Sequence, residues 1–344
     1  MRIFVYEFVT GGGWLQVERS LPPQSLLAEG AAMLQAVVAD FAALSDCKAP
    51  ECEVVVMRDA RLRDSFAIPS AIVQEVHSRE EELATFNRLA QSSDQVLLIA
   101  PEFSGNLHSR AQIVEQQAGK LISPSAKFVA LAADKWCSHL LLAKAGVPTP
   151  HSLLLQRGVS LPSFLVYPVV LKPVDGCGSI GVQRVNSAQE KIDWSELRGP
   201  EIIAQAFHSG MAASIAVLCG PTEKVCLPAC RQMLSNDGRF RYLGGETPLP
   251  AELQERAEAL ALDCLAVLPP ACGWVGIDLM LGESAEYDCV IEINPRVTTS
   301  YVGLRALCQT NLAAAMLAVV AGKKPALQFH SKTVRFAADG KIEA

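Results

Sequence analysis

The stretch Tyr287-Asp288-Cys289-Val290-Ile291-Glu292-Ile293-Asn294-Pro295-Arg296 has the pattern of a buried strand that ends in polar side chains. Glu292 and Asn294 stand two residues apart among β-branched apolar residues, so they project from the same face of a strand. Pro295 ends the strand pairing and fixes a turn that presents Arg296. A carboxylate, an amide and a guanidinium are therefore expected at one point, as in a metal and phosphate site.

A second apolar run, residues 273–281, carries a lone carboxylate, Asp278, in its middle. A buried carboxylate without a partner is costly, so a cation is expected beside it. If the two runs pair as a hairpin, Asp278, Glu292 and Asn294 come together. Such oxygen ligands suit Mg²⁺ held between a protein and nucleotide phosphates, with Mn²⁺ as the alternative ion. A more ordinary interpretation stays open here, in which Asp278 caps a turn and Glu292 pairs with Arg296.

Length and composition indicate a globular protein with more than one domain. The 344 residues exceed one ordinary core, so two or three domains or lobes are expected. Half of the residues are hydrophobic and 19% are charged, which argues against a disordered or coiled-coil chain. The net charge of −6 and the lack of a basic run argue against a nucleic-acid partner.

The eleven cysteines indicate a reducing compartment. Their number is odd and they are scattered through apolar segments, so we expect reduced thiols and a cytoplasmic protein. Cys226 and Cys230 have no second pair or histidine at zinc spacing, so no zinc site is expected there. The longest unbroken apolar run, residues 312–321, is too short to span a bilayer, and Arg2 begins a strand rather than a signal peptide. We therefore predict no membrane contact.

Residues 1–120 alternate strand and helix patterns, which predicts an α/β domain with a mostly parallel, Rossmann-like sheet. Ligands of such sheets gather at the carboxyl ends of the strands, here residues 10–13 and 101–103. The triple glycine at 11–13 lacks the spacing of a dinucleotide-binding loop, so no NAD is expected. Glu102 either enters a helix or contacts a substrate. The expected strands are 2–9, 53–57, 71–76 and 95–100, and the expected helices are 25–44 and 79–91.

Residues 121–200 are expected to form a small α+β lobe with a glycine-rich loop. Lys135 precedes a helix, and Lys172 closes a strand directly before the loop at residues 174–182. Exposed backbone N–H groups of such a loop can close over phosphate oxygens. The same glycines would fit a hairpin turn equally well if Lys172 were not upstream. The candidate loop contacts are Gly176, Gly178, Ser179 and Gly181.

Residues 201–344 are expected to form a larger α+β lobe. Successive strand patterns joined by tight turns, and only then helices, indicate an antiparallel sheet. Arg231 lies on one of these strands, either as a second phosphate-binding residue or as a surface arginine. The expected strands before the two runs described above are 202–207, 214–218, 225–234 and 239–242, and the expected helices are 251–267 and 304–320.

Taken in order, the two lysines, the glycine loop, Asp278 and the Glu-x-Asn-Pro-Arg motif at 292–296 resemble the ATP-grasp superfamily of carboxylate–amine ligases. The resemblance runs from about residue 120 to the end of the chain. Residues 1–120 look like the N-terminal substrate domain of that family. The resemblance implies the ATP-grasp fold, in which this α/β domain accompanies two α+β lobes that enclose ATP.

The resemblance also implies roles for single residues. Lysines that match Lys135 and Lys172 contact the nucleotide phosphates in such proteins, and the glycine loop acts as a lid. The strand that matches residues 203–207 reads adenine mainly through its backbone, which makes Gln205 and Phe207 nucleotide contacts. The glutamate common in that strand is replaced here, so the adenine contacts depart from the family pattern.

A closer resemblance is suggested by residues 4–13, by Ala100-Pro101-Glu102 and by Tyr242-x-Gly244-Gly245-x-Thr247-Pro248. These look like the tyramine–glutamate ligase branch, which makes the first amide of methanofuran-type one-carbon cofactors. The implied reaction joins the side-chain carboxylate of L-glutamate to tyramine or a similar amine through an acyl phosphate, and releases ADP and phosphate.

In that reaction Arg296 is expected to stabilise charge on the reacting oxygens, with Arg231 as a second candidate. An apolar slot for an aromatic amine is expected at residues 10–13 and 101–103. The expected partners are a small-molecule carboxylate and amine, with a homodimer as an option. Two alternatives stay open: a ligase for other amino acids, and an ATP-binding regulator without catalysis.

Overall fold

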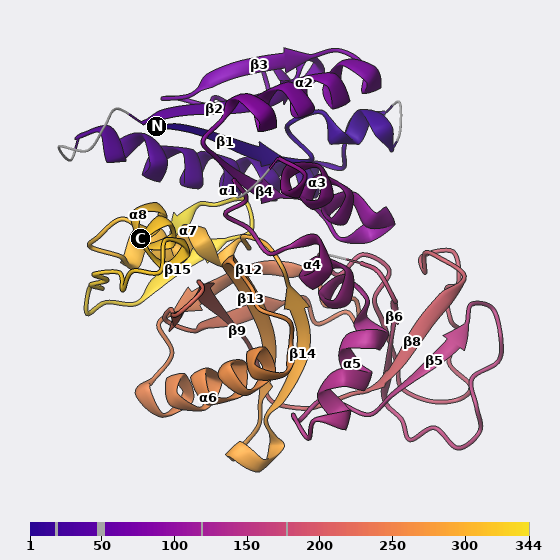
Figure 1. Cartoon of the computed structure of the whole chain (residues 1–344). Coiled ribbons are helices and arrows are strands. Elements are labelled where there is room, and N and C mark those ends of the chain that lie inside the picture. Colours follow the sequence, from indigo (N-terminus) through magenta and orange to yellow (C-terminus); the bar gives the residue numbers. More distant parts are fainter. Residues whose placement is uncertain (18–19, 47–51, 118–119, 177, 344) are drawn as a thin grey trace.

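The computed structural model describes residues 1–17, 20–46, 52–117, 120–176 and 178–343, which form three sheets and the helices around them (Figure 1). The N-terminal sheet is parallel with strand order β3-β2-β1-β4, as the alternation of strands and helices predicts. Its strands are β1 (Arg2–Glu7), β2 (Glu53–Asp59), β3 (Ile72–Val76) and β4 (Gln95–Ile99).

Helices cover both faces of this sheet because successive strand residues point to opposite sides. Ile3 and Val5 face α1 (Gln24–Ala42), whereas Phe4 and Tyr6 face α2 (Arg79–Ser92) and α3 (Asn106–Glu115). Short 3-10 turns, η1 (Gly13–Gln16) and η4 (Phe103–Gly105), follow β1 and β4.

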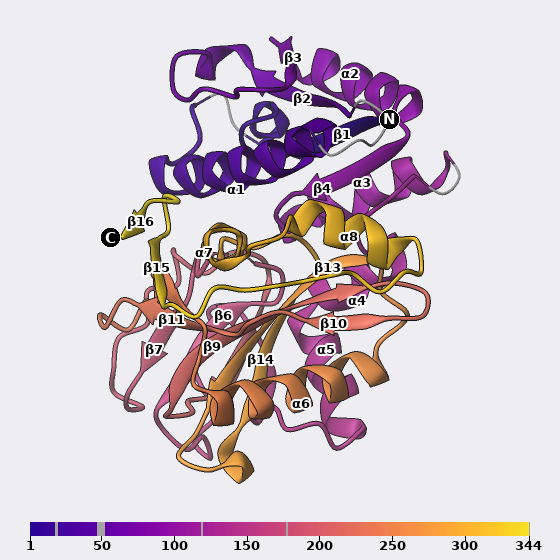
Figure 2. The same cartoon turned by 90° about the vertical axis from the view of Figure 1, so that its left-hand side faces the viewer.

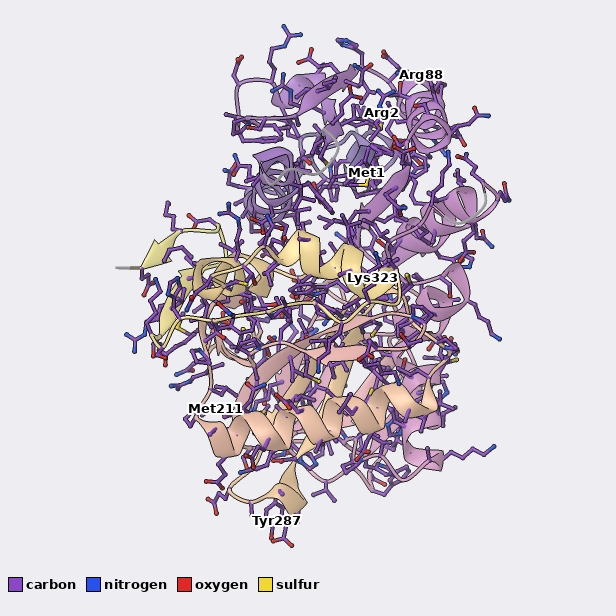
Figure 3. The ribbon with its side chains drawn as sticks, turned by 60° about the vertical axis from the view of Figure 1, so that its left-hand side comes forward. Met1, Arg2, Arg88, Met211, Tyr287 and Lys323 are labelled. Carbon is purple, nitrogen blue, oxygen red and sulfur yellow. The ribbon has the colours of Figure 1, made fainter. Side chains whose placement is uncertain are left out.

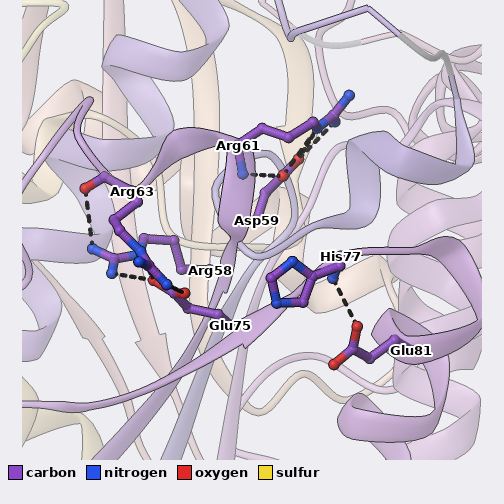
Figure 4. Close-up of polar contacts among 7 residues, drawn as sticks. All are labelled: Arg58, Asp59, Arg61, Arg63, Glu75, His77 and Glu81. Carbon is purple, nitrogen blue, oxygen red and sulfur yellow. Dashed lines mark hydrogen bonds and ion pairs between the residues drawn. The ribbon is translucent and has the colours of Figure 1, made fainter.

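The outer edge of the N-terminal sheet is held by ion pairs (Figure 4). Arg58 and Arg63 both bind Glu75 of β3. At the start of α2, the Glu81 N–H donates to the Ser78 hydroxyl and the His77 N–H donates to the Glu81 carboxylate, at 3.2 and 2.9 Å. This reciprocal capping fixes where α2 begins. These side chains are structural, and none of them lines the cavity described below.

Helix α1 also joins the N-terminal sheet to the C-terminal part of the chain. Its inner residues share one apolar core with α7 (Ser300–Leu307) and α8 (Leu312–Val320). Asp40 of α1 accepts hydrogen bonds from the Tyr301 hydroxyl at 2.8 Å and from Arg305 at 2.6 Å. Among the described residues, α1 is the one helix with the length and composition to span a membrane, but in this fold its apolar residues are packed in the core.

A small antiparallel sheet of order β5-β8-β6-β7 forms a separate lobe. Its strands are β5 (Ser152–Gln156), β6 (Val169–Pro173), β7 (Gln183–Val185) and β8 (Glu201–Ala206). Strand β8 pairs with both β5 and β6, so a lobe boundary at residue 200 would separate it from its partners. We propose to place that boundary after β8. Helices α4 (Ala126–Ala133) and α5 (Lys135–Lys144) connect this lobe to the N-terminal domain.

The large sheet has the order β14-β13-β9-β11-β12-β15-β16, with β10 paired to β9. Helix α6 (Ala251–Val267) packs on one face, and α7 and α8 pack on the other (Figure 2). Figure 3 shows Tyr287, on the turn between β13 and β14, at the opposite end of the molecule from Arg88 of α2. The strands are β9 (Met211–Cys219), β10 (Lys224–Cys226), β11 (Cys230–Leu234), β12 (Tyr242–Thr247), β13 (Gly273–Leu281), β14 (Cys289–Asn294), β15 (Val334–Ala337) and β16 (Ile342–Glu343).

Several predicted elements are wrong in detail. The closing helix expected at 304–320 is two helices, because Asn311 caps α8 by accepting a hydrogen bond from the Ala314 N–H at 2.8 Å. The strand expected at 225–234 is two strands, separated at Pro228, which has no N–H to donate. The strand expected at 239–242 begins only at Tyr242. Helices α3 and α4 were not expected.

Candidate active site

A cavity lies between the small sheet, the large sheet and α1, and it brings together most of the predicted site residues. Three parts of the chain that are distant in sequence supply its walls. From the predictions it contains Lys135, Lys172, Gly176, Gly178, Ser179, Gln205, Phe207, Asp278, Glu292, Asn294 and Arg296. It also contains Glu29, Gln232, Phe240 and Tyr242, none of which the sequence analysis assigned to the site.

The predicted metal ligands lie on paired strands. Asp278 of β13 stands directly opposite Glu292 of β14, as a hairpin of the two runs requires. The Asn294 amide donates to Asp278 Oδ2 at 3.0 Å, and the Gln232 amide donates to Asp278 Oδ1 at 2.9 Å. Burial, reinforced by the negative charge of Glu292, raises the pKa of Asp278 to about 7. A cation beside Asp278 would favour its charged form.

A β-bulge in β14 helps to shape the cavity. Asp278 pairs with Glu292, but the next residue, Leu279, pairs with Val290, so Ile291 is an extra residue. Val290 therefore packs in the core against α6, whereas Ile291 and Glu292 both line the cavity. Simple alternation would have placed Ile291 on the core side.

The two predicted lysines reach the carboxylates from the small lobe. Lys135 Nζ lies 3.0 Å from Glu292 Oε1 and donates to the Gly176 carbonyl at 2.6 Å. Lys172 Nζ donates to Gln205 Oε1 at 2.9 Å. Burial lowers the pKa of Lys172 to about 8, against the attraction of Glu292. Two ammonium groups beside two carboxylates give the site positive charge for phosphate oxygens and negative charge for a metal ion.

The glycine-rich loop lies over this site. The Ser179 hydroxyl donates to the Phe240 carbonyl at 2.7 Å, which ties the loop to the large sheet. Gly181 does not line the cavity; it has a φ of 73°, and a Cβ there would lie 2.6 Å from the Glu196 carbonyl oxygen. A Cβ on Gly178 would lie 3.9 Å from Leu26 of α1. Cys177 lies outside the described residues.

An aromatic wall stands at the end of β8. The rings of Phe207 and Phe240 are stacked, with centroids 6.3 Å apart and planes 20° apart, and both line the cavity. The Arg184 guanidinium lies 4.1 Å from the centre of the Phe207 ring. A flat heterocycle fits such a wall. Phe240 was missed because it follows a turn, outside every strand pattern.

Arg296 has a different partner from the one in the ordinary interpretation. Its Nε lies 2.9 Å from Glu102 Oε1, while Glu292 pairs with Lys135. Glu102 is buried and does not line the cavity. Glu102 therefore holds Arg296 in position, and its predicted direct contact with a substrate is not supported.

The predicted slot for an aromatic amine is wrong. None of residues 10–13 or 101–103 is among the described residues that line the cavity. Gly13 packs against the ring of Phe8, and Gly12 packs against Val76, so these glycines allow close packing instead of leaving space. The strand ends are part of the buried core of the N-terminal domain.

Arg231 is also not at the cavity. It is exposed on β11, whereas its neighbour Gln232 lines the cavity and binds Asp278. Adjacent strand residues point to opposite faces, so only one of the two can reach the site. The sequence therefore predicted a site role for the wrong residue of this pair.

The side chains of Asp278, Glu292 and Asn294 fit a Mg²⁺ ion that also binds phosphate oxygens. Within the described residues there is no cluster of three or more His, Cys, Asp or Glu side chains able to bind a metal. Two carboxylates and an amide are instead the partial set found where phosphate oxygens and water complete the shell of Mg²⁺.

Comparisons with known proteins agree with this geometry. A family model described as "ATP-grasp domain" matches residues 132–300, and one described as "pre ATP-grasp 3 domain" matches residues 52–129. The chain is 26% identical over 251 residues to a tyramine–L-glutamate ligase of Methanocaldococcus jannaschii, covering 73% of this chain and 70% of that protein. It is 25% identical over 256 residues to a D-alanine–D-alanine ligase of Hydrogenovibrio crunogenus, covering 70% and 81%.

A solved structure has a similar fold along almost the whole chain. It is an ATP-grasp superfamily protein from Archaeoglobus fulgidus, with a TM-score of 0.73 and 22% identity, covering 98% of this chain and 92% of that one. The N-terminal domain and both lobes are therefore arranged as in that superfamily.

Proposed function

This chain belongs to the ATP-grasp superfamily of ATP-dependent ligases, and from that premise we propose that it joins a carboxylate to an amine at the cavity described above. ATP phosphorylates the carboxylate, and the amine then displaces phosphate from the acyl phosphate. The products are an amide, ADP and phosphate. The observation that carries the proposal is the meeting of Lys135, Lys172, Asp278 and Glu292 at one cavity.

Phosphoryl transfer to a carboxylate needs positioning and charge neutralisation more than covalent catalysis. Lys135 and Lys172 would bind phosphate oxygens, and the glycine-rich loop, whose Gly176, Gly178 and Ser179 line the cavity, would cover them. Arg296, held by Glu102, neutralises charge on the oxygens of the reacting centre. Phe207 and Phe240 hold the adenine ring, and Gln205 fixes Lys172.

Asp278, Glu292 and Asn294 are the residues that would hold Mg²⁺. When bound, Mg²⁺ neutralises phosphate charge as a Lewis acid. The raised pKa of Asp278 supports this assignment, because its carboxylate lacks a cationic partner strong enough to offset its burial.

For the substrates we propose the side-chain carboxylate of L-glutamate and tyramine or a close aromatic relative. The similarity to a tyramine–L-glutamate ligase supports this choice. The similarity to a D-alanine–D-alanine ligase favours a second candidate, a ligase for other amino acids.

The test is incubation with ATP, Mg²⁺, L-glutamate and a panel of amines, followed by mass detection of the amide and analysis of the nucleotide products. We expect γ-glutamyltyramine and ADP. AMP and pyrophosphate would reject the acyl-phosphate route. Amide formation only with aliphatic amino acids would reject the substrates and leave the ligase assignment standing.

We also propose a cellular location and an oligomeric state for this enzyme. We place the enzyme in the cytoplasm, in line with the reduced thiols expected from its odd number of cysteines. A homodimer is proposed as the assembly, and light scattering during gel filtration measures its mass directly. A monomeric mass at assay concentration would reject it.

A further inference from the structure

Glu29 is a cavity carboxylate that the reaction described so far does not use. It lies on α1, so the N-terminal domain supplies it, whereas Asp278 and Glu292 come from the large sheet. Asp278 accepts two amide hydrogen bonds and Glu292 pairs with Lys135. Glu29 makes no hydrogen bond or ion pair with any other described residue. A carboxylate kept in a cavity without such a partner is costly, which points to a ligand.

Glu29 lines the same cavity as the glycine-rich loop, Arg296 and Tyr242. Leu26, one helical turn earlier on α1, lies near Gly178 of the glycine-rich loop. Arg296 is near enough to oppose the effect of burial, which raises the pKa of Glu29 to about 7. Tyr242 also lines the cavity, and after burial the negative charge of Glu29 is one of the causes that raise the pKa of Tyr242. Glu29 therefore lies among the loop, Arg296 and Tyr242.

The charges and proton changes of the reactants indicate what Glu29 binds. ATP and the two carboxylates of L-glutamate are negatively charged, and the cavity offers Lys135, Lys172 and Arg296 for them. The α-ammonium group of L-glutamate passes through the reaction unchanged. The acceptor amine is a cation at neutral pH and must lose a proton before its nitrogen can attack. We propose that Glu29 binds the ammonium group of the acceptor and removes that proton. This inference rests on the ligase function proposed above and adds the residue that recognises the second substrate.

The carboxylate of Glu29 takes one proton from R–NH₃⁺, and the lone pair of R–NH₂ attacks the carbonyl carbon of the acyl phosphate. A C–N bond forms and the C–O bond to phosphate breaks. The nitrogen's second proton leaves with the phosphate, which departs as hydrogen phosphate. Glu29 returns its proton to water after the products leave.

The test compares two nucleophiles in the Glu29→Gln variant. Hydroxylamine is neutral at pH 7, so it attacks the acyl phosphate without needing a base or an ammonium site. With ATP and L-glutamate we expect the variant to form the γ-glutamyl hydroxamate within about threefold of the wild-type rate. Amide formation with tyramine should fall by at least about 100-fold, the scale of a lost general base. Glu255→Gln, exposed on α6, is the matched control and should leave both rates unchanged.

The other possible outcomes each contradict either the role of Glu29 or the proposed ligase function. Equal loss of both rates in Glu29→Gln would place Glu29 at ATP or the donor and overturn the inference. Wild-type rates with tyramine would overturn it too. Failure of the wild-type enzyme to form any hydroxamate would instead reject the proposed ligase function. Glu29→Asp, which keeps the carboxylate, should recover part of the tyramine rate; a rate no better than that of Glu29→Gln would contradict a carboxylate role.

Discussion

Replacing Glu29 with glutamine should stabilise the ligand-free protein at neutral pH, although it removes a functional group. Burial raises the pKa of Glu29 from 4.5 to about 7, so the folded state binds its proton more tightly than the unfolded chain does. The wild-type protein therefore loses stability as the pH rises from 4.5 to 7. Glutamine has no proton to lose, so the variant escapes this loss.

The size of the effect follows from the shift. One pKa unit corresponds to about 1.4 kcal/mol, so the full shift sets an upper limit of about 3.5 kcal/mol at pH 8. Because Glu29 retains some contact with water in the cavity, we expect roughly 1 to 3 kcal/mol. Near pH 4 the difference between the two proteins should disappear, since Glu29 is then protonated in both the folded and the unfolded state.

The measurement is urea unfolding of wild type, Glu29→Gln and the control Glu255→Gln at several pH values between 4 and 8. The gain of Glu29→Gln over wild type should grow with pH, while the control stays level. A gain that does not depend on pH would show that the substitution acts through packing. A variant less stable than wild type at pH 8 would refute the reasoning, because Glu29 would then have a stabilising partner.

Asp278→Asn or Glu292→Gln should lower turnover by at least about 100-fold while the circular dichroism spectrum stays that of the wild type, because each removes a carboxylate from the proposed metal site; wild-type rates in either variant would contradict that site. Amide hydrogen exchange in residues 174–182 should slow when an ATP analogue and Mg²⁺ are added, since bound phosphates compensate the ordering of the glycine loop; unchanged exchange would count against a lid. Tyr301→Phe should lower the free energy of unfolding by about 1 to 2 kcal/mol in urea, because the buried Asp40 loses a hydrogen bond at 2.8 Å; an unchanged value would mean that Arg305 satisfies Asp40 alone.

The pairing of β13 and β14, which places Asp278 opposite Glu292, could be predicted because its signal is local. Carboxylates inside apolar strands are costly, and two such strands joined by a short turn pair with their neighbours in sequence. Asp278 and Glu292 therefore meet as expected. Lys172 was predictable for a similar reason, since it closes a strand directly before the glycine loop.

The residues that were missed depend on long-range packing or on register. Glu29 looks like a surface residue of an amphipathic helix until α1 is placed beside the large sheet. The bulge at Ile291 changes which side chains face the cavity, and no local pattern marks it. Glycines 11–13 suggested space for a ligand, but the neighbouring rings fill that space. The prediction for Arg231 was wrong by one residue, because pairing with β9 and β12 determines which side chains of β11 face the cavity.

The core that α1 shares with α7 and α8 makes the first and last parts of the chain mutually dependent during synthesis. The face of α1 that packs on α7 and α8 leaves the ribosome early, but those two helices are made more than 250 residues later. Until then that face is uncovered and offers a binding site to chaperones. A chain that ends before residue 300 should therefore aggregate instead of yielding a soluble N-terminal domain. An organism that splits this protein into two polypeptides would need them to fold together.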